Sequence, residues 1–144
     1  MRRILVASDF SKVSRKAFAT AVAWAKRNGA ALTIVHVTTP FLPFTSDEYV
    51  APETLEQLDA QSRRWIKRHL TALVDKARRA GVRAVGVTAN GDAAEQIVRL
   101  ARSKHADLLI VGTHGRTGLE KFFVGSVAAR IVATAPCPVV TVRG

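Results

Sequence analysis

Two short segments in the last third of the chain carry the residue types that bind phosphate. Segment 112–115 reads Gly-Thr-His-Gly and directly follows the apolar run 106–111, and a Gly-Ser pair stands at 125–126. Glycine lets a ligand come close to the backbone and adopts positive φ angles where a turn needs them. A helix that starts after the Gly-Ser pair offers free N–H groups and a partial positive charge. Strand, glycine loop and helix start together predict a phosphate or nucleotide site.

The glycine pattern differs from the two common phosphate-binding motifs. Neither Gly-x-x-x-x-Gly-Lys-Ser/Thr nor Gly-x-Gly-x-x-Gly occurs in the sequence. Glycines also serve strand-to-helix turns for geometric reasons, so a turn without any ligand is the structural alternative. The complete spacing, Gly-x2-Gly-x9-Gly-Ser, is more specific than the glycines alone.

Length and composition are typical of one globular domain spanning residues 1–144. The chain has 144 residues, a size that supports a buried core. It has no apolar run of about 18 residues, the length of a membrane span, and no signal-peptide pattern. Cys137 is the single cysteine, so no internal disulfide can form. These features favour a cytoplasmic protein.

The formal net charge of +11 would suit nucleic acid, an anionic membrane surface or an anionic ligand. The basic residues are spread along the chain, however, and the densest group, 63–68, lies on one predicted helix. No motif that reads DNA or RNA occurs. We therefore expect neither a specific nucleic-acid partner nor a membrane partner.

Apolar runs and helical spacings alternate along the sequence. Strands are predicted at 3–8, 31–37, 82–89, 107–111 and 138–142. Between them, helices are predicted after Ser11, from 53 to 80, after the Asp92/Glu95 capping box and from Ser126. Continuous apolar strands that alternate with helices predict an α/β fold, a doubly wound parallel sheet with helices on both faces. Helical spacing assigns Trp24, Leu55, Leu58, Trp65 and Val132 to inward faces.

Three further segments extend the glycine pattern to most of the chain. They are the opening run 3–11 (Arg-Ile-Leu-Val-Ala-Ser-Asp-Phe-Ser), the strand 32–37 (Leu-Thr-Ile-Val-His-Val) and the ending 137–142 (Cys-Pro-Val-Val-Thr-Val). Together these segments resemble the universal stress protein family. The resemblance implies five parallel strands in the order 3-2-1-4-5. The glycine signature is intact, as in the family members that bind ATP.

That strand order places the loops after the first and fourth strands on either side of one crevice, where the winding reverses. The resemblance implies that Asp9 contacts the ribose or a Mg²⁺ ion, that Val37 reads the adenine edge and that Val111 packs on the base. The glycines and the helix start after them would hold the phosphates. The implied nucleotide-binding residues are Ala7, Ser8, Asp9, Val37, Val111, Gly112, His114, Gly115, Gly125, Ser126 and Val127.

Several of these residues have a purely structural alternative. Asp9 could cap the first helix, His114 could be an exposed loop residue, and Ser126 could be an N-cap. His36 and His69 are better explained as packed histidines than as ligands.

The preferred function is an ATP-binding stress protein that acts as a small regulatory module, with Mg²⁺ accompanying the nucleotide. The sequence offers no paired carboxylates and no Ser-His-Asp arrangement, so we expect binding with little or slow hydrolysis rather than an enzyme. Two alternatives remain: an interaction module with an empty pocket, and an enzyme of the adenine-nucleotide hydrolase-like group. The motifs of that group, Ser-Gly-Gly-x-Asp-Ser and His-x-Gly-His, do not occur.

The last strand suggests a partner. Residues Val139–Val142 are apolar, β-branched and expected at a sheet edge, which invites pairing with another strand. The resemblance implies antiparallel pairing of this strand across a two-fold axis. We therefore expect a homodimer.

Overall fold

The computed structural model describes residues 1–39, 51–114 and 124–144, and within these ranges strands and helices alternate as the sequence predicts. The elements are β1 (Arg3–Ala7), α1 (Lys12–Asn28), β2 (Ala31–Thr38), α2 (Pro52–Arg79), β3 (Ala84–Asn90), α3 (Ala93–Ser103), β4 (Leu108–Gly112), α4 (Ser126–Thr134) and β5 (Val139–Val142).

The strands form one parallel sheet in the order β3-β2-β1-β4-β5, which confirms the expected order. Strand β1 lies in the centre, where Ile4 pairs with Leu32 of β2 on one side and with Leu108 of β4 on the other. The chain therefore winds outward from β1 in one direction and from β4 in the opposite direction. Such a reversal point is where open α/β sheets bind their ligands.

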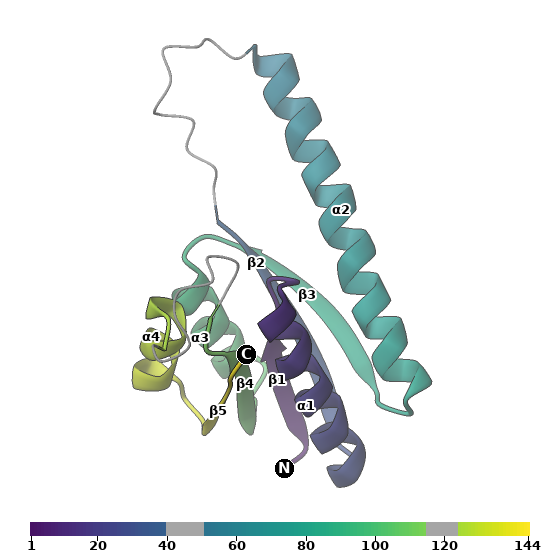
Figure 1. Ribbon diagram of the computed structural model, residues 1–144, viewed down its shortest axis with the longest axis vertical. Helices are drawn as coiled ribbons and strands as arrows, with labels where there is room; N and C mark the ends of the chain where they lie inside the picture. The colour runs from purple at the N-terminus through teal and green to yellow at the C-terminus, as the bar shows by residue number, and fades with distance from the viewer. Residues whose placement is uncertain (40–50, 115–123) are drawn as a thin grey trace.

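Helices cover both faces of the sheet, with α1 and α2 on one face and α3 and α4 on the other (Figure 1). Successive strand residues point to opposite faces. In β1, Ile4 and Val6 therefore join the core under α1 and α2, whereas Leu5 joins the core under α3 and α4. The two buried layers explain why the inner strands β1 and β4 are continuous apolar runs.

The helix boundaries follow local capping chemistry. The Ser11 hydroxyl accepts the Ser14 N–H at 3.2 Å and caps α1, and Asp92 Oδ1 accepts the Glu95 N–H at 2.9 Å and caps α3. Gly29 ends α1 in the left-handed conformation, with a φ angle of 62°. Helix α4 begins at Ser126 with Gly125 in the N-cap position, so the N-cap alternative for Ser126 is wrong.

Some residues that helical spacing assigned to inward faces lie at the surface. Trp24 is 38% exposed and Val132 is 53% exposed, so the prediction that they are core residues is wrong. Leu55 and Leu58 are also exposed, because the N-terminal end of α2 extends beyond the sheet (Figure 1). Helical spacing identifies the apolar side of a helix, but it cannot show how far a neighbouring sheet reaches. None of the described helices is both long and apolar enough to cross a membrane.

The central strands should dominate stability. Ile34 of β2 is fully buried, and Ile34→Ala should lower the free energy of unfolding by about 2–5 kcal/mol through the cavity that it leaves. Val132→Ala, at an exposed site, should change it by less than about 0.5 kcal/mol. Urea denaturation of both variants measures the difference, and equal losses would contradict this assignment of the core.

Candidate functional site

A cavity of about 400 Å³ opens at the carboxyl ends of β1 and β4, within the size range of small-molecule sites. It contains every nucleotide-binding residue expected from the sequence except Gly115, which lies outside the described residues. The expected residues that line it are Ala7, Ser8, Asp9, Val37, Val111, Gly112, His114, Gly125, Ser126 and Val127.

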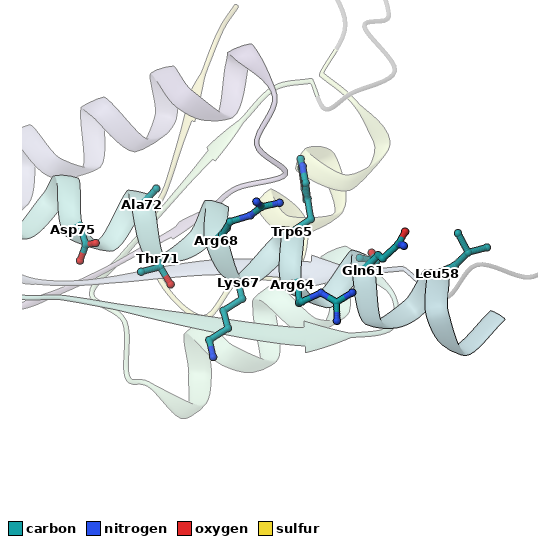
Figure 2. Close-up of a pocket in the computed structure, with 10 residues that line it drawn as sticks. Leu58, Gln61, Arg64, Trp65, Lys67, Arg68, Thr71, Ala72 and Asp75 are labelled. Carbon is teal, nitrogen blue, oxygen red and sulfur yellow. The ribbon is translucent and has the colours of Figure 1, made fainter. Parts of the chain in front are cut away.

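A larger hollow, about 980 Å³, lies along α2 and is shown in Figure 2. Its described lining comes from that one helix, and side chains such as Arg64, Lys67 and Arg68 extend from different sides of it. A binding site needs polar groups that converge from several elements. The smaller cavity meets this requirement and contains the residues expected from the sequence, whereas the hollow along α2 does neither, so we take the smaller cavity as the candidate site.

The loop after β1 is held by hydrogen bonds from three of its backbone N–H groups. The Ser8 N–H donates to the Val35 carbonyl at 2.8 Å, and the Phe10 N–H donates to the Ser8 hydroxyl at 3.1 Å. The Ser11 N–H donates to Asp9 Oδ1 at 3.0 Å. Asp9 is thereby fixed at the cavity wall, while the capping residue of α1 is Ser11, so the alternative that Asp9 caps this helix is wrong.

Asp9 is ionised at neutral pH. Partial burial raises the pKa of its carboxyl, but hydrogen bonds from Ser11 and Ser14 together outweigh this effect, so the pKa lies below its ordinary value. The cavity therefore has a fixed negative charge on the β1 side. A carboxylate in this position can accept hydrogen bonds from hydroxyl groups or bind a cation.

The loop after β4 is tied to α4 and β5 through Thr113. The Thr113 N–H donates to the Val142 carbonyl at 2.9 Å, and the Gly125 N–H donates to the Thr113 carbonyl at 2.7 Å. These bonds hold the start of α4 beside the end of β4. A Cβ atom on Gly112 would lie 2.9 Å from Val13 Cγ1, and one on Gly125 would lie 3.0 Å from the Thr113 oxygen. Close packing therefore explains why glycine stands at both positions, independently of any ligand.

The start of α4 faces the cavity without a side-chain cap. The first N–H groups of a helix have no partner within the helix, and Gly125 makes no side-chain cap bond. Ser126 and Val127, the first two residues of α4, both line the cavity. This side of the cavity therefore offers backbone donors and the positive end of the helix dipole.

His114 contributes an unusual polar atom. Its Nδ1 lies 2.9 Å from the Thr113 hydroxyl, whereas its Nε2 is buried and has no hydrogen-bond partner among the described residues. An unpaired buried polar atom costs free energy, which a ligand at this position would recover. His114 is partly buried, so the alternative of an exposed loop residue is wrong. His36, by contrast, is satisfied as expected, because its Nδ1 donates to the Ser8 carbonyl at 2.8 Å.

The sequence reasoning missed several residues of the cavity wall. Their common feature is a position at the carboxyl edge of the sheet or in the first turns of the helices that follow it. They are Ser14, Val35, Thr39, Ala93, Ile97, Thr113, Ala128 and Ile131. The capping box at Asp92 was the available signal for Ala93, because in a parallel sheet every following helix starts at the same edge.

The described residues contain no group of three or more His, Cys, Asp or Glu side chains that could hold a metal ion. A divalent cation in this cavity would have Asp9 as its carboxylate ligand and would need further oxygens from a ligand and from water.

Comparison with known proteins agrees with this fold. The family model described as the universal stress protein family matches residues 1–143. The chain belongs to the universal stress protein family. Universal stress protein YxiE of Bacillus subtilis is 33% identical over 145 residues, an alignment that covers 98% of each chain.

Two solved universal stress proteins resemble this structure over nearly their whole length. One, in complex with cAMP, has a TM-score of 0.73 and 26% identity, and the match covers 99% of this chain and 97% of that chain. The other, from Archaeoglobus fulgidus in complex with dAMP, has a TM-score of 0.69 and 22% identity, with 99% and 98% covered.

The depressed pKa of Asp9 predicts a pH-dependent contribution to stability. A carboxyl whose pKa is lower in the folded state stabilises the protein above its unfolded pKa, about 3.9, and loses this effect as the pH falls through the folded pKa. Asp9→Asn should therefore be less stable than wild type at pH 7, and the two proteins should converge in acid. Urea denaturation between pH 7 and the acid limit of folding measures this, and a pH-independent difference would refute it.

Proposed function

We propose that this universal stress protein is a single nucleotide-binding domain that binds an adenine nucleotide, ATP with Mg²⁺, and serves as a small regulatory module of the cytoplasm. The observation that carries the proposal is the pairing of opposite electrostatic features across one cavity. The ionised Asp9 stands on the β1 side, and the uncapped start of α4 stands on the β4 side.

The two sides suit different parts of a nucleotide. Phosphate oxygens fit the N–H groups of Ser126 and Val127, because anions bind helix starts. The Asp9 carboxylate would repel a bare phosphate, so it suits the ribose hydroxyls or a Mg²⁺ ion placed between it and the phosphates. Val37 and Val111 give an apolar wall for the base. The buried Nε2 of His114 is a further partner for a ligand atom.

The relatives support an adenine nucleotide as the ligand class. The universal stress protein solved with cAMP shares 26% of its residues with this chain, and the Archaeoglobus fulgidus protein solved with dAMP shares the fold. Both ligands carry adenine, a pentose and a single phosphate group. ATP is proposed because the glycine signature is intact, as in the family members that bind ATP, and the Asp9 carboxylate offers a ligand for the accompanying Mg²⁺ ion.

We expect little or slow hydrolysis. The described cavity lining includes Asp9 as its sole carboxylate and contains no lysine or arginine. Phosphoryl transfer depends on positioned cations and on a group that orients the attacking water. The described part of the cavity is therefore better suited to holding a nucleotide than to cleaving it.

Calorimetric titration with ATP and Mg²⁺ tests the proposal. Wild type should bind, and Asp9→Ala should raise the dissociation constant by about tenfold or more through the loss of a charged hydrogen-bond acceptor. Asp107→Ala is the matched control. Asp107 also accepts two backbone N–H bonds, from Arg2 and Arg3 at 2.7 and 2.8 Å, but at the start of β4, at the opposite end of the strand from the cavity. Its affinity should equal that of wild type.

The titration should be repeated at two or more temperatures, because the enthalpy of binding can be zero at one of them. If folded wild-type protein gives no binding heat at any of these temperatures, the chain is an interaction module rather than a nucleotide-binding protein. Equal weakening by Asp9→Ala and Asp107→Ala would show that the carboxylates act through stability rather than through the ligand.

We further propose a homodimer formed by antiparallel pairing of β5, Val139–Val142. Strand β5 is an edge strand that pairs with β4 on one side. The carbonyls of Pro138 and Val142 accept N–H bonds from β4, at Leu109 and Thr113. By the two-residue alternation of a parallel strand, the N–H of Thr141 points away from β4 and is available to a partner strand.

Thr141→Pro should therefore abolish dimer formation, because it removes that outward N–H while leaving the bonds to β4 in place. Thr141→Val keeps the N–H and is the control that should remain dimeric. Sedimentation at micromolar concentration measures the assembly state. A monomeric wild type, or a dimeric Thr141→Pro variant, would rule out this interface.

A further inference from the structure

An aromatic contact joins the long helix α2 to the loop that carries Asp9. We propose that Phe10 is a positioning residue: α2 holds its ring, and the ring fixes the backbone on which the Asp9 carboxylate faces the cavity. This inference rests on the proposed function, since it assigns part of the geometry of the nucleotide site to a residue that is not among the described lining of the cavity.

The ring of Phe10 is enclosed by three other rings, which with it form the aromatic cluster: Phe10, His36, Trp65 and His69. Phe10 stacks on His36 of β2 with centroids 4.6 Å apart and an interplanar angle of 22°. It meets Trp65 edge-on at 5.3 Å and 84°, and His69 lies at 5.4 Å. Such pairs stabilise beyond the area that they bury. The loop after β1 therefore contacts α2 through the Phe10 side chain.

Two hydrogen bonds fasten the aromatic cluster at both ends. On the cavity side, His36 Nδ1 donates to the carbonyl of Ser8, the residue before Asp9, at 2.8 Å. On the helix side, His69 Nδ1 donates to the Trp65 carbonyl at 2.8 Å, and the two rings lie 3.9 Å apart. Figure 2 shows Trp65 projecting from one side of α2 and Lys67 from the other. Trp65 lines the hollow along α2 and also contacts Phe10, so it connects that helix to the loop after β1.

The backbone of Phe10 is in a strained conformation that its surroundings must hold in place. Phe10 has a φ angle of 65°, in the left-handed region that costs free energy for any residue except glycine. Such strain persists only where the surroundings enforce it. Phe10 lies between Asp9 and Ser11, whose N–H donates to Asp9 Oδ1, so its backbone angle sets the geometry of that hydrogen bond.

Phe10→Gly separates positioning from strain, because glycine adopts the left-handed conformation freely but lacks the ring. We expect this variant to fold, with a circular dichroism spectrum like that of wild type. Its dissociation constant for ATP with Mg²⁺ should rise about tenfold, a coupling typical of residues in contact. Phe10→Leu, which keeps apolar volume but not the stacked ring, should move in the same direction.

A double-mutant cycle with Asp9 compares the effect of Phe10→Gly on the affinity for ATP in two backgrounds, wild type and Asp9→Ala. A purely structural role of Phe10 would give the same effect in both. If Phe10 acts through Asp9, Phe10→Gly should change the affinity of an Asp9→Ala protein by less than about threefold. An equal effect in both backgrounds, or unchanged affinity in the Phe10→Gly single variant, would overturn the inference while leaving the proposed function in place.

Two tryptophan substitutions, one at the contact and one away from it, test the role of α2. Trp65→Ala removes the edge-on partner of Phe10 and should weaken nucleotide binding. Trp24→Ala removes the other tryptophan, which is 38% exposed on α1, and should leave binding unchanged. Equal effects of the two substitutions would contradict a specific role for α2.

Hydrogen exchange keeps the two proposals distinguishable. If wild type binds no nucleotide, the proposed function fails, and the positioning role is then decided in the nucleotide-free protein. There Phe10→Gly and Trp65→Ala should accelerate exchange of the Ser11 N–H, which is bonded to Asp9, whereas Trp24→Ala should not. Unchanged exchange at Ser11 in the first two variants would overturn the inference.

Discussion

Strand β1 pairs with β2 on one side and with β4 on the other, and the second pairing determines where a ligand can enter. Ile4 and Val6 of β1 lie in register with Leu108 and Ile110 of β4. The connections that follow these two strands lead in opposite directions, toward β2 and toward β5. Their loops therefore diverge and leave a cavity at this edge of the sheet. The position of the cavity depends on this one parallel pairing, which is itself buried between two helical layers.

The positive charge of the molecule does not extend to the described lining of its cavity. The chain has a formal net charge of +11, yet the described lining of the cavity contains neither lysine nor arginine. Attraction for phosphate at this site comes instead from backbone groups at the start of α4, which the hydrogen bond from Gly125 to Thr113 holds beside β4. The basic side chains can raise the rate at which an anion approaches, but they do not define where it binds.

The order of elements and most of the cavity wall could be predicted from the sequence because they follow from local rules. Apolar runs mark strands, Ser11 and Asp92 mark helix starts, and glycines mark the close approaches at 112 and 125. The strand order itself came from family resemblance, since periodicity does not report which strands are neighbours. The exposure of Trp24 could not be predicted, because helical spacing does not show which part of a helix other elements cover. The left-handed conformation of Phe10 could not be predicted either, because it depends on rings from β2 and α2.

A crystal structure of the protein grown with excess Mg²⁺ and ATP tests the central claim most directly. The account predicts electron density for the nucleotide between β1 and β4, with phosphate oxygens at the Ser126 and Val127 N–H groups and with Asp9 on the ribose or on the metal ion. A cavity closed by its own side chains, or a nucleotide bound only in the hollow along α2, would contradict it.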